Sequence, residues 1–437
     1  MGCVSLTSVR IPDSVLEIGF GAFRGCFALS SVMIPPGIVK IEPYTFSECR
    51  DLVSVSIPDT VSEIGIYAFS HCENLASITF PDGISVLSSG LFDGCANLAS
   101  FMIPESVTKI ESAAFSQCIK LTSVILPAGV TEISHFAFCN CTNLTSVTLS
   151  GDVTKIGENA FANCISLISV SQWHGIAEIG KNAFENCTGL TSVEIHGSLR
   201  EIAPNTFNNC TGLVSVVLPD TVAKIAEKAF YNCVSLASFE FTEQLREIEK
   251  QAFASCKSLT SVILPKSVSV IERETFSDCS GLRELVLPDS LEKIRSGAFR
   301  NCENLTSVIL PEHLALLGDS AFAGCIRLVS VSIPDSIKTI YSFTFSGCTS
   351  LASVIIPDSV TSIESGAFSN CSGMTSAVIP DSVEEIYDNA FHGCSKLTVT
   401  CSPRTRAWAY CNVHKIPVEV SGRSSRAGLW EKLFGKK

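Results

Sequence analysis

The chain has 437 residues, of which 46% are hydrophobic and 17% are charged, and its formal net charge at pH 7 is −12. Soluble globular domains carry about 25% charged residues, so this composition predicts that an unusually large share of the chain is buried. The negative charge and the absence of a basic face argue against a nucleic-acid partner. Polar residues interrupt every apolar stretch before it reaches the roughly 18 to 20 residues of a spanning helix, so we predict no transmembrane segment.

The dominant feature of the sequence is an internal repeat of 23 residues. Cysteine recurs at this interval from Cys26 to Cys394, and a phenylalanine stands three residues before each of these cysteines. Seventeen full units run from Leu6 to Cys394 without an insertion or a deletion. A fixed period of this length predicts a solenoid, in which each unit buries its apolar face against its neighbours.

Each unit divides into three short segments, as the copy at residues 351–371 shows. Leu-x-Ser-Val-x-Ile has the spacing of a short strand, and the proline and acidic residue after it predict a turn. Val-x-x-Ile predicts a second extended piece, and Ala-Phe-x-x-Cys predicts a single helical turn. We expect the strands of successive units to stack in parallel, about 4.8 Å apart.

Eighteen of the 21 cysteines share one column of the repeat, since Cys3 is in phase with Cys26 and its successors. We expect these thiols to be reduced and packed, because free cysteine can act as a small buried hydrophobe. The other three are out of register. Cys139 is expected to be an exposed thiol, and Cys401 and Cys411 either pair with each other or stay free.

The unit resembles the BspA-like, or treponemal-type, leucine-rich repeat, which carries a 23-residue Leu-x-x-Ile-x-Ile-Pro…Ile-Gly…Ala-Phe-x-x-Cys pattern. The resemblance covers residues 3–400. It implies a right-handed leucine-rich-repeat solenoid of the α/β repeat class, with a parallel β-sheet on the concave face and short helical turns or irregular structure on the convex side. Many members are similar to surface proteins of bacteria and parasitic protists that bind host matrix proteins or other cells. This functional step is an analogy, because the family is defined by its fold.

The sequence predicts three parts: a solenoid over residues 1–400, a C-terminal cap over 401–420 and a basic flexible tail over 421–437. The cap is expected to form a helical turn and then an edge strand. The apolar residues of 429–437 could share a helical face beside lysines and contact a membrane or a partner, or the tail could be solvated.

The first repeat begins in mid-unit, with no N-terminal cap and no signal peptide. Two explanations remain open. The chain is part of a longer protein, or its apolar first repeat supports end-to-end self-association.

One outward column of the first strand is predicted to bind a partner. Two positions after the serine, the later repeats are mostly apolar although the fold does not require it, and exposed contiguous apolar surface marks interaction sites. The alternative is the β-propensity of these residues in an exposed strand. The column comprises Val217, Glu240, Ile263, Val286, Ile309, Ile355 and Val378, with Ser332 interrupting it.

A ligand-binding rim is predicted where three consecutive repeats lose the proline of the turn. Stacking would bring Trp173, His174 and His196 together there, with Gln172 and Glu194 beside them. These groups could bind a ligand, but the two histidines lack a defined ligand spacing, so we assign no metal site. The alternative is sequence drift in an exposed turn.

The turn that follows the first strand carries a column of acidic residues. Asp or Glu follows the proline in many units, including Asp289, Glu312, Asp335, Asp358 and Asp381. Such a column either recruits cations or a basic partner, or serves only to form the turn.

These patterns predict a non-enzymatic scaffold without a cofactor, which binds protein at a cell surface or after secretion. The expected partner is an extracellular matrix or host surface protein. An insertion-free solenoid lacks the enclosed cleft that enzymes need. The alternatives are a cytoplasmic interaction scaffold, held at a membrane by the basic tail, and a metal-dependent hydrolase at the Trp173/His196 rim.

Overall fold

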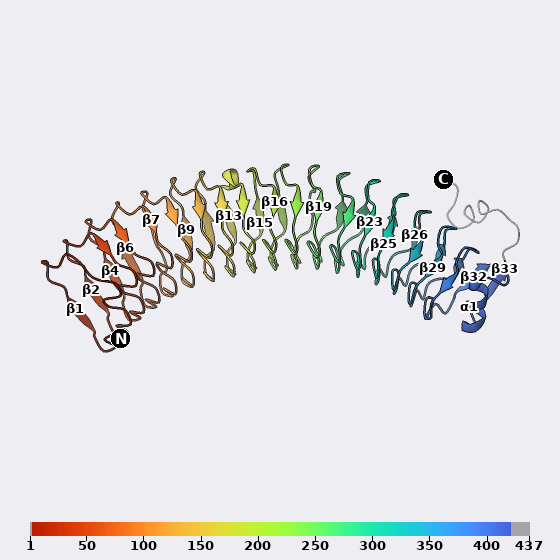
Figure 1. The fold of residues 1–437 in the computed structure, drawn as a ribbon, viewed down its shortest axis with the longest axis horizontal. Coiled ribbons are helices and arrows are strands. Elements are labelled where there is room, and N and C mark those ends of the chain that lie inside the picture. The colour runs from red at the N-terminus through yellow and green to blue at the C-terminus, as the bar shows by residue number, and fades with distance from the viewer. Residues whose placement is uncertain (1, 421–437) are drawn as a thin grey trace. The chain divides into compact units, whose positions relative to one another are not determined.

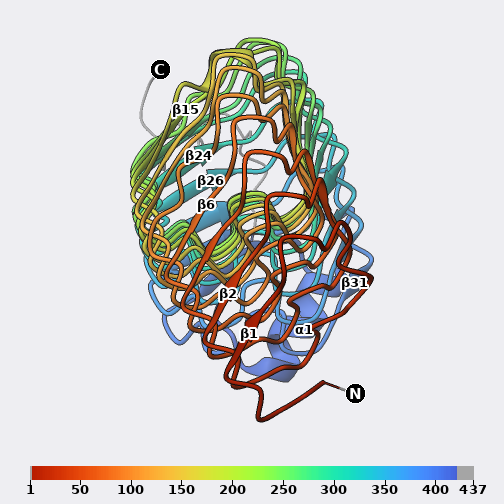
Figure 2. The ribbon, with the colours of Figure 1, turned by 90° about the vertical axis from the view of Figure 1, so that its left-hand side faces the viewer.

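The computed structural model describes residues 2–420, which form two compact units divided between Leu236 and Ala237. In each unit the chain winds into a stack of similar turns, one for each 23-residue repeat (Figure 1). Figure 2 views the chain from the side of strand β1 (Ser8–Arg10) and shows the turns of unit 1 stacked one behind another. The predicted leucine-rich-repeat solenoid is confirmed.

Most turns contribute one strand to a first strand row, formed mainly by the Ser-Val segment. Within the repeats these strands pair in parallel with a register of 23 residues, so Val32 lies opposite Val55 in unit 1 and Val308 lies opposite Val331 in unit 2. In unit 1 the row comprises β1, β2 (Ser31–Met33), β4 (Ser54–Ser56), β6 (Ser77–Thr79), β9 (Ser123–Ile125), β11 (Ser146–Thr148), β13 (Ser169–Ser171), β15 (Ser192–Glu194) and β17 (Ser215–Val217). In unit 2 it comprises β20 (Ser261–Ile263), β22 (Glu284–Val286), β24 (Ser307–Ile309), β26 (Ser330–Ser332), β28 (Ser353–Ile355), β30 (Ser376–Val378), β32 (Thr398–Cys401) and β33 (Val418–Val420).

A second strand row is formed by the Val-x-x-Ile segments, with two residues from each turn after the first. The first residue of each pair lies outside and the second is buried. In unit 1 the row comprises β3 (Lys40–Ile41), β5 (Glu63–Ile64), β7 (Val86–Leu87), β8 (Lys109–Ile110), β10 (Glu132–Ile133), β12 (Lys155–Ile156), β14 (Glu178–Ile179), β16 (Glu201–Ile202) and β18 (Lys224–Ile225). In unit 2 it comprises β19 (Glu247–Ile248), β21 (Val270–Ile271), β23 (Lys293–Ile294), β25 (Leu316–Leu317), β27 (Thr339–Ile340), β29 (Ser362–Ile363) and β31 (Glu385–Ile386).

The core is built from columns of identical side chains. One phenylalanine per turn is almost fully buried, and neighbouring rings stack, as Phe138 and Phe161 do with centroids 5.3 Å apart and planes 3° apart. The cysteine column lies beside these rings. The Cys187 thiol, for example, donates a hydrogen bond to the Phe161 carbonyl oxygen of the preceding repeat at 3.2 Å. Because burial disfavours the thiolate, the pKa of Cys187 is raised well above its ordinary value.

The prediction of a reduced and packed cysteine column is confirmed, because the cysteines from Cys26 to Cys394 are free and buried. Cys3 belongs to the same column and is exposed. The prediction that Cys139 is an exposed thiol is wrong, since this side chain is buried and its pKa is raised by desolvation. Cys401 and Cys411 are buried free thiols.

The Ala-Phe-x-x-Cys segment forms tight turns, so the predicted single helical turn is wrong. In the second repeat, Tyr44 and Glu48 both have left-handed backbone angles, with φ of 58° and 65°. Between them, the Phe46 N–H donates to the Ala68 carbonyl oxygen of the next turn at 2.8 Å. The backbone therefore alternates between bonds within one turn and bonds to the next, and this alternation joins the turns on the side away from the strands.

Phenylalanine interrupts the first strand row at residues 100–102. Phe101 takes the place of the buried valine, and its ring packs against Phe80 and Phe92 with centroids 5.2 Å from each. The chain forms no regular strand at this turn, where a large ring replaces the valine. Residues 238–240 in unit 2 follow the same rule, since Phe239 stands in the valine column.

The last described residues close one end of unit 2. Helix α1 (Arg406–His414) is N-capped by Thr405, whose side-chain oxygen accepts a hydrogen bond from the Trp408 N–H at 3.3 Å. Buried Tyr410 accepts a hydrogen bond from the Phe391 N–H through its hydroxyl, and strand β33 then pairs with β32. The segment predicted to form a helical turn and an edge strand thus contains α1 and β33. The tail at 421–437, with its predicted apolar face, lies outside the described residues.

Candidate functional site

The outward column of the first strand row is the main candidate site. Residues in these three-residue strands alternate between the two faces, so the third residue points outward when the second is buried. In unit 2 the apolar members are largely exposed, with Ile263 58%, Val286 44% and Ile309 83% exposed, while Ile355 and Val378 are half-buried. Glu240 is exposed in the same unit, and Val217 in unit 1 is 48% exposed.

Sequence reasoning missed three members of this column in unit 1. Met33, Met102 and Ile125 occupy the same repeat position and are 80%, 91% and 71% exposed. The signal was the same 23-residue spacing, extended towards the N-terminus. In unit 1, however, Ser, Thr and Glu occupy much of the column and only Met102 and Ile125 lie in consecutive turns, whereas in unit 2 apolar residues recur in nearly every turn.

A surface hollow of about 480 Å³ opens in unit 2 where Ser332 interrupts the column. Ile309 and Ile355 lie on either side of it, one turn before and one turn after Ser332. Glu312 and Asp335, from the turns that follow two of these strands, line its edge. We call this feature the Ser332 hollow.

The predicted rim is only partly assembled. The imidazoles of His174 and His196 stack with centroids 5.6 Å apart, and His196 Nε2 lies 3.1 Å from Glu194 Oε1. Trp173 is not on the exposed rim. It lies in the 3₁₀ turn η1 (Trp173–Gly175), is 3% exposed, and donates from its ring nitrogen to the Val170 carbonyl oxygen at 2.8 Å.

Gln172 forms the entry to this turn, since its backbone has a left-handed φ of 67° immediately before η1. The indole therefore fills the interior at a position where most other repeats have proline. What remains at the surface is a histidine pair with one carboxylate. Among residues 2–420, no group of three or more His, Cys, Asp or Glu side chains is arranged to hold a metal ion.

Comparison with known families settles the class of the protein. The model for the BspA type leucine-rich repeat region matches residues 1–118, 86–214, 200–327 and 269–398, which together cover most of the chain. The chain belongs to this family. No curated protein matches it.

A solved leucine-rich repeat protein shares the fold of this BspA-type chain, and other solved leucine-rich repeat proteins are similar to it in sequence. A leucine-rich repeat protein from Bacteroides ovatus has 24% sequence identity and a TM-score of 0.59, over 97% of this chain and 94% of that one. A leucine-rich cell surface protein from Faecalibacterium prausnitzii has 27% identity and a TM-score of 0.46, over 77% of this chain and 88% of that one. The T. pallidum leucine-rich repeat protein has 30% identity and a TM-score of 0.30, over 47% of this chain and 77% of that one.

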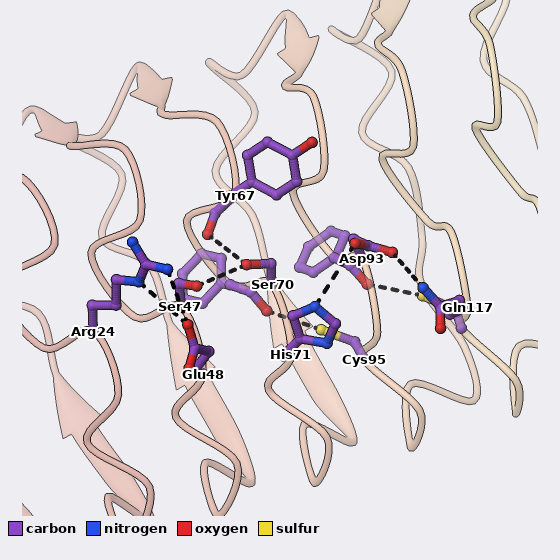
Figure 3. Close-up of polar contacts among 12 residues, drawn as sticks. Arg24, Ser47, Glu48, Tyr67, Ser70, His71, Asp93, Cys95 and Gln117 are labelled. Carbon is purple, nitrogen blue, oxygen red and sulfur yellow. Dashed lines mark hydrogen bonds and ion pairs between the residues drawn. The ribbon is translucent and has the colours of Figure 1, made fainter. Parts of the chain in front are cut away.

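A line of polar side chains, separate from the outward column, runs across successive turns of this BspA-type chain near the cysteine column. In the first turns it consists of unlike polar pairs (Figure 3). Arg24 Nη2 lies 3.2 Å from Glu48 Oε1, and Asp93 accepts a hydrogen bond from Gln117 Nε2 at 3.2 Å, with His71 Nε2 4.0 Å away. These groups satisfy one another across successive turns, so the line joins the turns.

No helix within residues 2–420 is both long enough and apolar enough to cross a bilayer.

Proposed function

We propose that this BspA-type chain is a non-enzymatic scaffold that binds a protein partner through its first strand row, and that it acts in adhesion at a cell surface. The partner would be a matrix protein or a protein of another cell. The proposal rests on the family resemblance, because many members of the family are similar to surface proteins of this kind. It assigns their binding role to the exposed strand row of this chain.

The observation that carries the proposal is the exposure of the apolar column in unit 2. Ile309 is 83% exposed, and the fold accepts a small or charged residue at the same position, since Ser332 and Glu194 also stand there. The isoleucine therefore contributes little to folding. Its burial against a partner would contribute about 1.5 to 3 kcal/mol, and several such side chains in adjacent turns form a contiguous patch.

The open geometry of this surface favours a macromolecule over a small substrate. The column runs along successive parallel strands, each about 4.8 Å from the next, so it offers an extended contact. Enzymes bind substrates in enclosed clefts with converging polar groups. An extended face of short strands suits a protein partner.

The test is the double variant Val286→Glu/Ile309→Glu. We expect it to lose binding to immobilised extracellular matrix proteins and to intact cells, because two carboxylates would be buried without partners. Surface plasmon resonance measures the binding, and thermal unfolding should be nearly unchanged because both side chains are exposed.

Val329→Glu is the matched control. Val329 is 51% exposed in the same unit but precedes strand β26, outside the column, so this variant should bind normally. Undiminished binding by the folded double variant would contradict a role for the column. Failure of the wild-type chain to bind any matrix protein or cell would contradict adhesion.

The proposed location has its own test. Brief protease treatment of intact source cells should remove the protein, as detected by an antibody, while a cytoplasmic enzyme of the same cells is spared. Protection of the protein until the cells are lysed would favour the alternative of an intracellular scaffold.

A further inference from the structure

The Ser332 hollow differs from every other small-residue position in the outward column. Ser56 is flanked by Met33 and Thr79, and Ser171 is flanked by Thr148 and Glu194. Ser332 alone has a β-branched aliphatic residue in both neighbouring turns. A gap with two apolar walls therefore exists at one turn of unit 2.

The two apolar walls of the hollow suit one bulky apolar side chain. Ile309 and Ile355 form the two sides, Pro334 lines one end, and the lining between them includes the serines Ser307, Ser330 and Ser332. Ile309 is largely exposed, so its outer face has no partner among the described residues. An inserted side chain would contact both isoleucines and remove apolar surface of both molecules from water.

The charges beside the hollow define the rest of the occupant. Glu312 and Asp335 line it, both are exposed, and neither forms an ion pair with another described residue. The same repeat position is acidic in five consecutive turns, about 4.8 Å apart along the stack. These residues are Asp289, Glu312, Asp335, Asp358 and Asp381. The resulting negative potential attracts cationic groups and repels acidic ones.

We propose that the Ser332 hollow binds a protein segment that inserts a bulky apolar side chain between Ile309 and Ile355 and places lysine or arginine beside Glu312 and Asp335. This inference rests on the proposed function, since it names the chemistry of the partner at that surface. Both parts of the site are needed, because the apolar gap supplies contact area and the carboxylates select for charge.

Synthetic peptides test the chemistry of the occupant directly on the full chain. The probe is a short fluorescent peptide with leucine at its centre and lysine on both sides. Two matched peptides replace the leucine with alanine or the lysines with glutamate. Fluorescence anisotropy should show binding of the first peptide and at least about tenfold weaker binding of the other two, because each has lost one of the two contacts. Equal binding of all three peptides would overturn the proposal, as would no binding of the first.

Variants of the protein locate the binding. Ser332→Ile fills the gap with the residue found in both neighbouring turns, so it should fold normally and weaken peptide binding at least about tenfold. Ser171→Ile makes the same change at the same repeat position in unit 1 and should have no effect. Glu312→Gln/Asp335→Asn should weaken binding and reduce its dependence on salt, which screens exposed charges. Wild-type affinity in folded Ser332→Ile would place the peptide elsewhere and overturn the proposal.

The outcome can be separated from that of the proposed function. If Val286→Glu/Ile309→Glu abolishes binding to matrix proteins but the lysine-leucine peptide does not bind, the adhesion role stands and this inference fails. If the peptide binds at the hollow but no matrix protein or cell is bound, the inference stands and the adhesion role fails.

Discussion

Two backbone positions in each repeat require residues that accept a left-handed conformation. Asn182 and Asn186, with φ of 56° and 60°, occupy both positions in one turn. Asparagine tolerates this conformation better than most residues, and its short amide can also bond locally. The asparagines that precede the column cysteines form such side-chain hydrogen bonds. Four consecutive hydrogen bonds, each between 2.6 and 2.9 Å, join the side-chain amides of Asn140, Asn163, Asn186, Asn209 and Asn232.

We predict that Asn186→Ala destabilises unit 1 by about 2 to 3 kcal/mol, as measured by urea unfolding. The substitution places a Cβ-bearing residue without a bonding side chain in the left-handed region, and it breaks two hydrogen bonds, to Asn163 and from Asn209. Asn186→Gly loses the same hydrogen bonds but accepts the conformation, so it should cost less. Equal losses in the two variants would show that the conformation contributes nothing.

At the scale of the element, part of the second strand row carries alternating charges. Lys155 Nζ lies 3.8 Å from Glu132 and 3.5 Å from Glu178, the residues opposite it in the turns before and after. Lys224 and Glu201 repeat the pairing at 3.2 Å. The pattern is local, since Glu178 and Glu201 of successive turns are both acidic, and it favours the pairing observed on either side of Lys155.

We predict that Lys155→Glu lowers the free energy of unfolding by about 1 kcal/mol, because four carboxylates, with Glu132, Glu178 and Glu201, would then lie in adjacent turns. The loss should shrink in 0.5 M salt, where exposed charges are screened. The rescue variant Lys155→Glu/Glu132→Lys/Glu178→Lys restores opposite charges on both sides of residue 155 and should recover part of the stability, since the new lysine at position 132 then lies beside Lys109. If the loss were independent of salt, the aliphatic stem of Lys155 rather than its charge would be responsible.

The repeat predicted the strand register and the buried core correctly, because both depend only on residues that recur every 23 positions. The spacing of valine, phenylalanine and cysteine gave the parallel register and the buried columns, because identical residues 23 apart must meet in a solenoid. It did not give the tight turns, since the apolar spacing of Ala-Phe-x-x-Cys fits one helical turn as well. The asparagines before Cys164 and Cys187 were the signal for left-handed turns.

Other features depend on side-chain volume and on contacts between turns, which a repeat pattern does not contain. Trp173 stands beside exposed polar residues in the sequence, yet its ring fills the interior and bonds to the backbone. Phe101 interrupts the strand row because of its size. The Ser332 hollow likewise follows from the residues in the two neighbouring turns, so the column pattern predicted an apolar surface but not its one gap.

At the scale of the whole chain, the buried cysteine column makes stability depend on alkaline pH. Burial raises the pKa of Cys49, Cys279 and Cys348 to about 12, from an ordinary thiol value of about 9. Above about pH 9 an unfolded chain loses these protons while the folded chain keeps them, so the folded state binds more protons there. The stabilisation is therefore complete below about pH 9 and is lost progressively as the pH rises towards 12.

We predict that the unfolding temperature, measured under reducing conditions, is flat from pH 7 to 8.5 and falls steeply by pH 10. Each buried thiol of this kind lowers the free energy of unfolding by about 1.4 kcal/mol per pH unit above its unfolded pKa, and these losses sum over the many turns of the column. This window lies below the ordinary lysine pKa of 10.5, which separates the effect from the loss of ion pairs. Cys279→Ala should unfold at a lower temperature at pH 7. Its unfolding temperature should also fall less steeply at alkaline pH, because one proton fewer is released on unfolding. A wild-type unfolding temperature unchanged up to pH 10 would contradict a protonated buried column.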